Sequence, residues 1–286
     1  MHILLIRHGQ STNNVVEAAL GDCPEFYQRR VVDPPLSPLG QSQAGALACH
    51  LGAQLHATAA QGRIRIVCSS MARALQTTAP LSEALGVTPL VRPDVVERCA
   101  FFSVDPTGTQ LAQPGPTAAD VLQRFPKFDA SLLSASAQST LETAAEARER
   151  AARVAAELLA TAQQQGAEAP ELLVLVAHAD FIGMLVRALL LSPASPPAEG
   201  AYWDLNNTAT VHITVQASGK VRLLHWNRSD HLNEALRTAP RGKDGKGPSW
   251  RWQRHGYRPS CLSQRPWAAA LRALGMNAGA APTPAR

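Results

Sequence analysis

The sequence predicts an α/β fold built as a three-layer sandwich, with a mainly parallel central sheet covered by helices. Short apolar segments of strand length alternate with longer Ala- and Leu-rich segments, an order typical of a sheet layered with helices. The run Leu172–Ala177 is continuously apolar, as expected for a strand buried on both faces. Two later strands joined around Ser218-Gly219 predict a hairpin, which places an antiparallel strand at or near one edge.

The N-terminal part of the chain is expected to begin with a strand and to continue into a long helix. His2–Ile6 is short and apolar and is bounded by a polar turn, which indicates a buried strand. Prolines fix φ and remove hydrogen-bond donors, so the proline-rich segment 33–40 is predicted to be a turn-rich connection. Ser37 as N-cap and Pro38 as the first helical residue then predict a helix that continues to about Leu55.

The later elements follow the same alternation. Arg63–Cys68 is predicted to be a second buried strand, and Gly166 and Pro170 are expected to end a long Ala-, Glu- and Arg-rich helix. The predicted helices after the second strand are Ala72–Leu85, Thr117–Phe125, Glu142–Gln165 and Phe181–Leu191. The loop Ser192–Gly200 then leads to the hairpin strands Ala209–Gln216 and Val221–Trp226.

The composition indicates a globular protein with one sizeable core. Of the 286 residues, 45% are hydrophobic, too many for a wholly disordered chain. No apolar run approaches the roughly 18 residues of a membrane span, and no signal peptide is expected at the start. Five scattered cysteines, never spaced as Cys-x-x-Cys, argue against a disulfide framework or a zinc site and favour the cytoplasm.

Basic charge is concentrated near the C-terminus. Residues 240–286 carry nine Lys or Arg and one Asp or Glu, whereas the remainder carries 18 basic and 21 acidic residues. This balance does not support a general nucleic-acid-binding surface on the body. We expect residues 237–286 to be a basic, largely flexible tail, with a short helix at Pro266–Leu274. Its tryptophans could stack on nucleic acid or dock on an acidic partner, and a loosely packed extension is the alternative.

Polar and charged side chains follow three of the predicted strands. The first strand is followed by Arg7-His8-Gly9, the second by Ser69-Ser70 and Arg73, and the third by His178. The carboxyl ends of parallel strands meet at one edge of a sheet, so we expect two histidines and two arginines to converge there. Guanidinium groups suit the oxygens of a phosphate monoester. A neutral imidazole is a competent nucleophile toward phosphorus, and a second, protonated imidazole can hold the charge of the transferred group.

The chain resembles the histidine phosphatase superfamily, the phosphoglycerate mutase-like clan, over residues 1 to about 235. The resemblance rests on motifs that occur in order at the predicted strand ends and around the last strands. They are Arg7-His8-Gly9 with Asn14, Pro35–Ala44, Ser69-Ser70 with Arg73–Thr77, His178, Asn206-Asn207-Thr208 and His231-Leu232. The resemblance implies a catalytic domain over residues 1–236, in which a cap insertion at 98–139 determines specificity.

The resemblance also implies a role for each matching residue. His8 would form a phosphohistidine, and Arg7, Arg73 and His178 would bind the phosphate, with Asn14 as a supporting donor. Gly9 is expected to let backbone and substrate approach closely. These roles make the chain a metal-independent phosphohydrolase without a cofactor, acting on a small phosphorylated substrate.

The family also places a general acid for the leaving oxygen on the segment after the second helix. Glu97 is the best match, although Asp94 and Asp105 lie close by in the sequence. The same carboxylate could then activate water to hydrolyse the phosphoenzyme. The sequence departs from the family at Ala179, where a glycine usually follows the second histidine; a methyl group should be tolerable there if φ is negative.

Other functions and structural roles remain open at this point. A mutase would return the phosphoryl group to another hydroxyl. The acidic and aromatic signature that follows the first histidine in glycolytic mutases is not evident here, and the segment Val15–Arg30 diverges from it, which favours hydrolysis. A catalytically weak scaffold acting through the tail is the third hypothesis. A turn-forming asparagine is the alternative for Asn14, a solvated carboxylate for Glu97, and Ser69-Ser70 are expected to cap the helix that follows.

Two further features are expected to play no part in catalysis. Arg254-His255-Gly256 repeats the tripeptide without a preceding strand and is assigned to the tail. The other histidines lack partners at ligand spacing, so no metal site is expected. They are His50, His56, His212 and His225.

Overall fold

The computed structural model describes residues 1–21, 23–136, 141–164, 172–191 and 203–238. The predicted loop Ser192–Gly200, the helix end at Gly166 and Pro170, and the tail from residue 239 onward lie outside the described residues. The tail helix Pro266–Leu274 and the tripeptide 254–256 therefore stay predictions. Within the described ranges, no helix combines the length and apolar character that crossing a bilayer requires.

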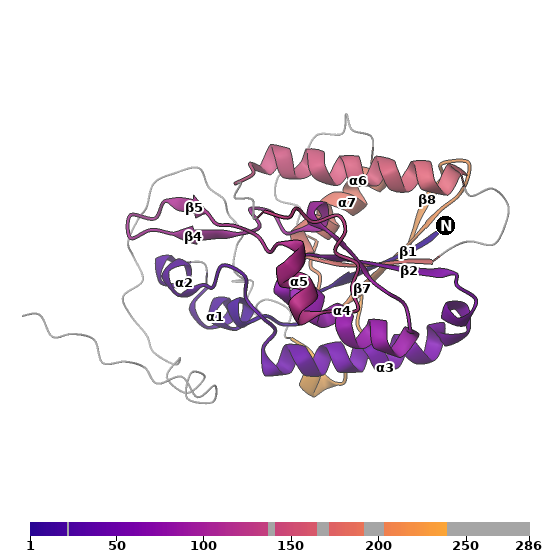
Figure 1. Ribbon diagram of the computed structural model, residues 1–286, viewed down its shortest axis with the longest axis horizontal. Helices are drawn as coiled ribbons and strands as arrows, with labels where there is room; N and C mark the ends of the chain where they lie inside the picture. The colour runs from indigo at the N-terminus through magenta and orange to yellow at the C-terminus, as the bar shows by residue number, and fades with distance from the viewer. Residues whose placement is uncertain (22, 137–140, 165–171, 192–202, 239–286) are drawn as a thin grey trace, which may run out of the picture.

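A six-stranded sheet forms the centre of the molecule, in the order β3-β2-β6-β1-β7-β8 (Figure 1). Its strands are β1 (His2–Arg7), β2 (Ile64–Ser69), β3 (Leu90–Arg92), β6 (Leu172–Ala177), β7 (Thr210–Val215) and β8 (Val221–Arg228). The pairs β1–β6, β2–β6 and β2–β3 are parallel, whereas β7 runs antiparallel to β1 and to β8. The predicted mainly parallel sheet is confirmed, with the antiparallel strand next to one edge.

Helices cover both faces of this sheet. The helices α3 (Pro38–Ala60) and α4 (Ala72–Leu85) lie on one face, and α6 (Ala144–Gln164) and α7 (Ala179–Leu190) lie on the other (Figure 1). Strand β1 shows why its sequence is apolar throughout: Ile3 and Leu5 belong to the core under α6 and α7, and Leu4 and Ile6 to the core over α3 and α4. Successive strand side chains point to opposite faces, so a strand between two helical layers needs an unbroken apolar run. The predicted three-layer sandwich is confirmed.

The predicted start of helix α3 is also confirmed. Ser37 Oγ accepts the Gly40 N–H over 3.0 Å, and Pro38 is the first helical residue. The helix extends to Ala60 rather than ending near Leu55. The sequence between these positions contains neither glycine nor proline, so no stop signal ends the helix at the expected place.

Several short elements were not predicted. They are α1 (Thr12–Leu20), α2 (Pro24–Arg29), the strands β3, β4 (Phe102–Val104) and β5 (Gln110–Ala112), and the 3-10 turns η1 (Pro93–Val95) and η2 (Glu234–Leu236). Strands of three residues are too short to show a period-two pattern. In Figure 1, α1, α2 and the β4–β5 hairpin lie together beyond the strand ends, on the side away from the N-terminus. The predicted helix Thr117–Phe125 is present as α5 (Ala118–Arg124), with Thr117 as its N-cap.

Candidate active site

Adjacent strands place the two predicted histidines side by side. In the register of the sheet, Arg7 of β1 lies opposite Ala177 of β6. His8 and His178, the residues that follow these positions, therefore leave the sheet at the same edge. Their ring centroids lie 5.1 Å apart with the ring planes at 56°, and both side chains are buried. Two imidazoles thus face one small volume at the carboxyl ends of β1 and β6.

The hydrogen bonds of His8 determine which ring nitrogen carries the proton. Nδ1 lies 2.7 Å from the carbonyl oxygen of Gly9, which only accepts, so Nδ1 must donate. Nε2 then has a lone pair, and it accepts the Arg73 Nε–H over 3.1 Å. Burial first, and then the charges of Arg73 and Arg7, lower the pKa of His8 well below its ordinary value. His8 is therefore neutral near pH 7, with its nucleophilic nitrogen turned toward Arg73.

His178 is held by Ser69 at the end of β2. His178 Nε2 lies 2.8 Å from Ser69 Oγ, and this hydroxyl also accepts the Met71 N–H over 3.3 Å. The other nitrogen of the His178 ring, Nδ1, is buried and has no hydrogen-bond partner among the described residues. A buried polar atom without a partner is costly. Its presence beside His8 indicates a place where an oxygen of a ligand binds.

The surroundings of His178 favour a neutral ring before any substrate binds. Burial first, and then the charges of Arg73, His8 and Arg7, lower the pKa of His178 well below its ordinary value. The expected protonated second imidazole is therefore not favoured in the structure as it stands. A bound phosphate dianion would bring the opposite charge that a protonated ring requires.

The two predicted arginines enter the site from different layers. Arg7 ends β1, and its Nη1 donates to the Leu205 carbonyl over 2.5 Å. Arg73 is buried in the first turn of α4, where Asp33 accepts the Ala72 N–H over 3.0 and 3.1 Å through its two carboxylate oxygens. Asp33 thus caps the helix that carries Arg73. The expectation that Ser69 and Ser70 cap this helix is wrong, because Asp33 supplies the cap from the turn-rich connection.

Glu97 lies against the helix that begins after His178. Its carboxylate accepts the Phe181 N–H over 3.1 Å and the Asp180 N–H over 3.4 Å, in the first turn of α7. Burial first, and then the charge of Asp180, raise the pKa of Glu97 to about 7. Arg73 acts on the same carboxylate in the opposite direction. Glu97 is therefore a carboxyl group that exchanges a proton near neutral pH, at the helix end next to His178.

Arg150 of α6 fixes the backbone that carries Glu97. Its Nη1 donates to the carbonyl oxygens of Asp94 and Val96, each over 2.9 Å. Its guanidinium pairs with Glu142 through both Nε and Nη2, and its Cζ lies 5.2 Å from the centre of the Phe181 ring. Arg150 thus holds the residue before Glu97 and packs against the residue whose N–H Glu97 accepts.

The two other carboxylates near Glu97 in the sequence are engaged elsewhere. Asp94 pairs with Arg92, and Asp105 accepts the Thr107 hydroxyl and backbone N–H in the exposed turn between β4 and β5. Glu97, in contrast, accepts two backbone N–H groups in the helix that begins directly after His178. The geometry therefore favours Glu97 over both neighbours.

Asn14 lies beside the loop that carries His8, and its side-chain oxygen takes part in a helix cap. Asn14 Oδ1 accepts the Ser11 N–H over 3.1 Å in the capping box of α1. It also accepts from Asn207 Nδ2 over 3.4 Å, while the same Asn207 nitrogen donates to the His8 carbonyl over 3.1 Å. The capping role of Asn14 is thus plain. Its part as a phosphate donor stays a prediction.

Gly9 allows close packing of two backbone segments. A Cβ at Gly9 would lie 2.6 Å from the Gly40 carbonyl oxygen, and one at Gly40 would lie 2.0 Å from the Gln10 carbonyl oxygen. These two glycines let the loop after β1 lie directly on the first turn of α3. The N–H of Gly9 also donates to Thr77 Oγ1 over 3.0 Å, which links the loop to α4.

The family model described as histidine phosphatase superfamily (branch 1) matches residues 3–229 of the chain. The chain belongs to this superfamily. The matched residues include both histidines, both arginines and Glu97. No match was found among the curated proteins.

The chain is similar to several solved phosphatase structures. The mycobacterial glucosyl-3-phosphoglycerate phosphatase in complex with VO3 is 27% identical, with 80% of this chain and 99% of that chain covered and a TM-score of 0.49. A phosphoserine phosphatase from Entamoeba histolytica is 20% identical, with 81% and 99% covered and a TM-score of 0.50. The ecdysone phosphate phosphatase from Bombix mori is 14% identical, with 84% and 97% covered and a TM-score of 0.56. The last two show likeness of fold.

Four residues that shape this site were not assigned to it from the sequence. Ser69 was assigned to helix capping and Asp33 to a turn, and Asp180 and Arg150 were given no role. Only the order of the strands brings Ser69 against His178, so no local pattern could reveal that contact. Asp180 could have been found, since it lies two residues after His178 in the first turn of the helix. The Ala179 between them is helical and does not have positive φ, so the missing glycine causes no strain.

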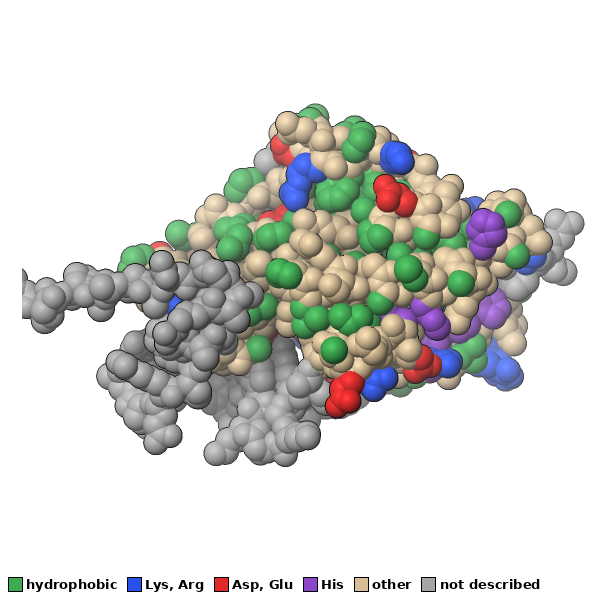
Figure 2. Space-filling view, turned by 90° about the horizontal axis from the view of Figure 1, so that it is seen from below, with side chains coloured by type: hydrophobic (Ala, Val, Ile, Leu, Met, Phe, Trp, Pro, Cys, Tyr) green, Lys and Arg blue, Asp and Glu red, His purple; other side chains and the backbone are tan. Residues whose placement is uncertain are grey.

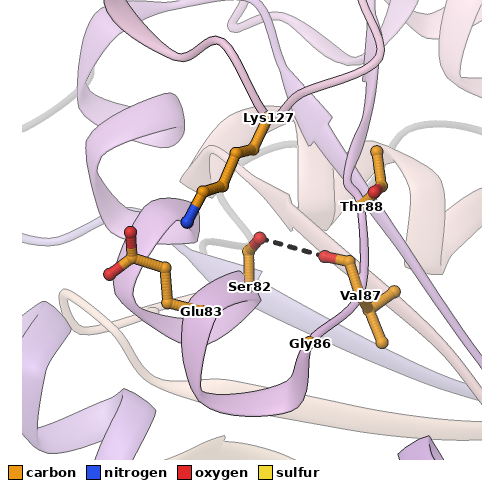
Figure 3. A pocket seen from close by; sticks show the side chains of 6 residues that line it. All are labelled: Ser82, Glu83, Gly86, Val87, Thr88 and Lys127. Atoms are coloured by element: carbon orange, nitrogen blue, oxygen red, sulfur yellow. Dashed lines mark hydrogen bonds between the residues drawn. The ribbon is translucent and has the colours of Figure 1, made fainter.

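Two other features lie away from this site. An open hollow of about 620 Å³ is lined by Ser82, Glu83, Gly86, Val87, Thr88 and Lys127 (Figure 3). It lies at the C-terminal end of α4, about 20 Å along the helix from Arg73. A histidine pair, His2 Nδ1 and His212 Nε2 at 3.0 Å, lies at the opposite end of β1 from His8.

Among the described residues, the face of the molecule on the side of α3 shows no large basic patch (Figure 2). No three His, Cys, Asp or Glu side chains within the described ranges are arranged to hold a metal ion. Seen from the side of α3, basic and acidic side chains are interspersed, and histidines gather at one end (Figure 2). The basic tail lies outside the described residues.

Proposed function

We propose that this protein hydrolyses phosphate monoesters of small molecules through a phosphohistidine formed on His8. The observation that carries the proposal is the contact of Arg73 Nε with His8 Nε2 at 3.1 Å. It places the unprotonated nitrogen of a neutral imidazole beside a guanidinium that suits a phosphate oxygen. Membership of the histidine phosphatase superfamily supports the same chemistry.

The first step would transfer the phosphoryl group to the protein. His8 Nε2 attacks phosphorus, a P–N bond forms, and the bond from phosphorus to the leaving oxygen breaks. Arg7, Arg73 and the protonated ring of His178 would bind the non-bridging oxygens, where preorganised positive charge stabilises the transition state. Glu97 in its protonated form would give its proton to the leaving oxygen. Its pKa of about 7 suits a group that must be protonated in one step and ionised in the next.

The second step would release inorganic phosphate. The carboxylate of Glu97 takes a proton from a water molecule whose oxygen attacks phosphorus. The P–N bond breaks and returns its electron pair to His8 Nε2. No step in this scheme passes through a metal ion or a cofactor. We place the activity in the cytoplasm, which the four free cysteines among the described residues favour.

The test uses the full-length chain and p-nitrophenyl phosphate in the presence of a chelator. Wild-type protein is expected to release p-nitrophenol and to form an acid-labile phosphoenzyme, and the variant His8→Ala is expected to do neither. Turnover that survives His8→Ala contradicts the phosphohistidine. Turnover confined to phosphoglycerates, with the phosphoryl group retained on the product, would instead establish a mutase. No turnover and no phosphoenzyme in the wild type would leave the scaffold hypothesis.

A further inference from the structure

Arg30 is held in one position beside the candidate active site. It follows α2, and its Nη1 donates to the carbonyl oxygen of Phe102, the first residue of β4. Its Cζ lies 3.6 Å from the centre of the Phe102 ring, a stacked cation–π contact. Arg30 thus joins α2 to the β4–β5 hairpin of the cap, two elements that Figure 1 shows side by side at the carboxyl end of the sheet.

No carboxylate among the described residues forms an ion pair with Arg30. Its neighbour Arg29 pairs with Glu25 at 2.6 Å, and Arg98 of the cap pairs with Asp180 at 3.5 Å. Arg30 is partly buried, and burial and the charge of Arg73 lower its pKa to about 10, which leaves it protonated at neutral pH. A partly buried cation beside a second cation, with no counter-ion, destabilises the protein. Such an arrangement is typical of a site that binds an anion.

The position of Arg30 relative to Arg73 indicates which part of a substrate it would meet. Arg73 contacts His8, and the cations that act on His8 are Arg73 and Arg7. Arg30 lies three residues before Asp33, whose carboxylate caps the helix that carries Arg73, and its guanidinium stacks on Phe102 of β4. Arg30 therefore lies on the side of Arg73 that faces the β4–β5 hairpin. With the phosphoryl group at His8, Arg30 would meet a leaving portion that extends toward this hairpin.

Donors for a ligand remain on this guanidinium. Of the five N–H groups that an arginine offers, only one on Nη1 is engaged by a described residue, the Phe102 carbonyl. Because the Phe102 contacts fix the plane of the group, little side-chain entropy is lost when the remaining donors bind a planar or tetrahedral anion.

We propose that Arg30 binds a second anionic group, a carboxylate or a further phosphate, on the leaving portion of the substrate. The substrate class is then a phosphate monoester that carries another acid, rather than the phosphate of a neutral alcohol. This inference rests on the proposed function, because it places the phosphoryl group at His8.

The experiment measures competition with p-nitrophenyl phosphate hydrolysis by the full-length chain. Two pairs of compounds serve as probes, and the members of each pair differ in one acidic group. They are 3-phosphoglycerate with glycerol 3-phosphate, and fructose 1,6-bisphosphate with fructose 6-phosphate. In at least one pair the compound with two acidic groups is expected to bind about 10–100-fold more tightly, the range of one charge-assisted contact. The pair that shows the preference identifies the group as carboxylate or phosphate.

Variants separate the role of Arg30 from a general effect of charge. Arg30→Met is expected to abolish the preference and to leave the affinity for the member with one acidic group within about twofold. Arg30→Lys keeps the charge but loses the planar fork, so it should restore the preference only in part. Arg29→Met removes the exposed cation next in sequence and is expected to change neither value. Circular dichroism and thermal unfolding report whether each variant is folded.

Two results overturn the inference. If neither pair shows a preference in the wild type, or if the preference survives Arg30→Met, then Arg30 binds no second acid. The wild-type reaction with p-nitrophenyl phosphate keeps this outcome distinct from failure of the proposed function. Absence of both turnover and phosphoenzyme would overturn the proposed function and this inference with it.

Discussion

Arg73 Nε donates to His8 Nε2 over 3.1 Å, while His8 Nδ1 donates to the Gly9 carbonyl over 2.7 Å. This pair of contacts fixes the tautomer of His8 and turns its lone pair to the side on which the arginine lies. A phosphate that binds there would replace the imidazole as the partner of Arg73. One guanidinium thus keeps the nucleophile neutral and is available to the transferred group.

Replacement of Arg73 is expected to remove most of the activity. Arg73→Met should lower kcat/KM for p-nitrophenyl phosphate by about 10²–10³-fold, the usual cost of one preorganised donor. Arg73→Lys keeps a cation but not the Nε donor or the fork, so it should recover only part of the loss. The measurement is steady-state kinetics at pH 6 to 7, with the exposed Arg65 of β2 changed to Met as the control. Activity within twofold of wild type in Arg73→Met would contradict the assigned role.

Removal of the Ser69 hydroxyl tests the contact that the sequence did not reveal. Ser69→Ala leaves His178 Nε2 without its partner at 2.8 Å, so both nitrogens of a buried ring lack partners. We expect the free energy of unfolding to fall by about 1–3 kcal/mol and kcat to fall by about tenfold as the ring loses its orientation. Urea unfolding and steady-state kinetics measure the two effects. Ser70→Ala is the neighbouring control, and an equal loss of kcat there would argue against a specific role for Ser69.

Asp180 is expected to set the pH at which Glu97 acts. The general acid must be protonated in the first step, so kcat/KM should be high below the pKa of Glu97, about 7, and should fall above it. The negative charge of Asp180 contributes to raising this pKa, so Asp180→Asn should lower it and move the alkaline limb to lower pH. The pH profile of kcat/KM with an alkyl phosphate measures the shift. Glu157→Gln removes a carboxylate that pairs with Arg92 and should leave the limb in place. A limb that moves upward in Asp180→Asn would refute this assignment.

Arg150 is expected to act on the reaction through the position of Glu97. A good leaving group such as p-nitrophenol needs little help from a general acid, whereas an alkoxide needs much. Arg150→Met should therefore lower kcat/KM for glycerol phosphate by about 10²-fold, close to the effect of Glu97→Gln, and should lower that for p-nitrophenyl phosphate only a few-fold. Arg150→Lys should recover part of the loss with glycerol phosphate.

The control for this prediction is Arg92→Met. Arg92 pairs with Asp94 and Glu157 and so contacts the same turn as Arg150 without binding the backbone before Glu97. It should affect the two substrates equally. If Arg150→Met lowers kcat/KM equally for both substrates, Arg150 supports only the fold and does not position Glu97.

Gly9 should tolerate no side chain. In Gly9→Ala the new Cβ would lie 2.6 Å from the Gly40 carbonyl oxygen, and this backbone oxygen cannot move without shifting the first turn of α3. We expect a loss of about 1–3 kcal/mol in the free energy of unfolding, measured by urea. Gly45 lies in the same helix, and a Cβ added to it would have no neighbouring atom within 4 Å. Gly45→Ala should stabilise the protein by about 0.4–1 kcal/mol, and the opposite order of the two variants would contradict the packing described for Gly9 and Gly40.

The sequence by itself determined the elements that repeat a local pattern. The short apolar run of β1 predicted a buried strand, the unbroken apolar run of β6 predicted a strand covered on both faces, and Ser37-Pro38 predicted the start of α3. Because reactive residues follow parallel strands at one edge, the order of these elements was also enough to predict that His8, His178, Arg7 and Arg73 belong to one site. Periodicity and capping depend on residues close together in the chain, so the sequence alone is enough to predict them.

Only the tertiary structure decided which side chains touch. The contact of Ser69 with His178 depends on β2 lying next to β6, and the Asp33 cap on α4 depends on where the turn-rich connection crosses the sheet edge. Arg30 reaches Phe102 because α2 and the β4–β5 hairpin, both too short to predict, lie together over the strand ends. These contacts join residues far apart in the chain, so they depend on how the sheet and the helical layers pack together. Local sequence patterns therefore cannot predict these contacts.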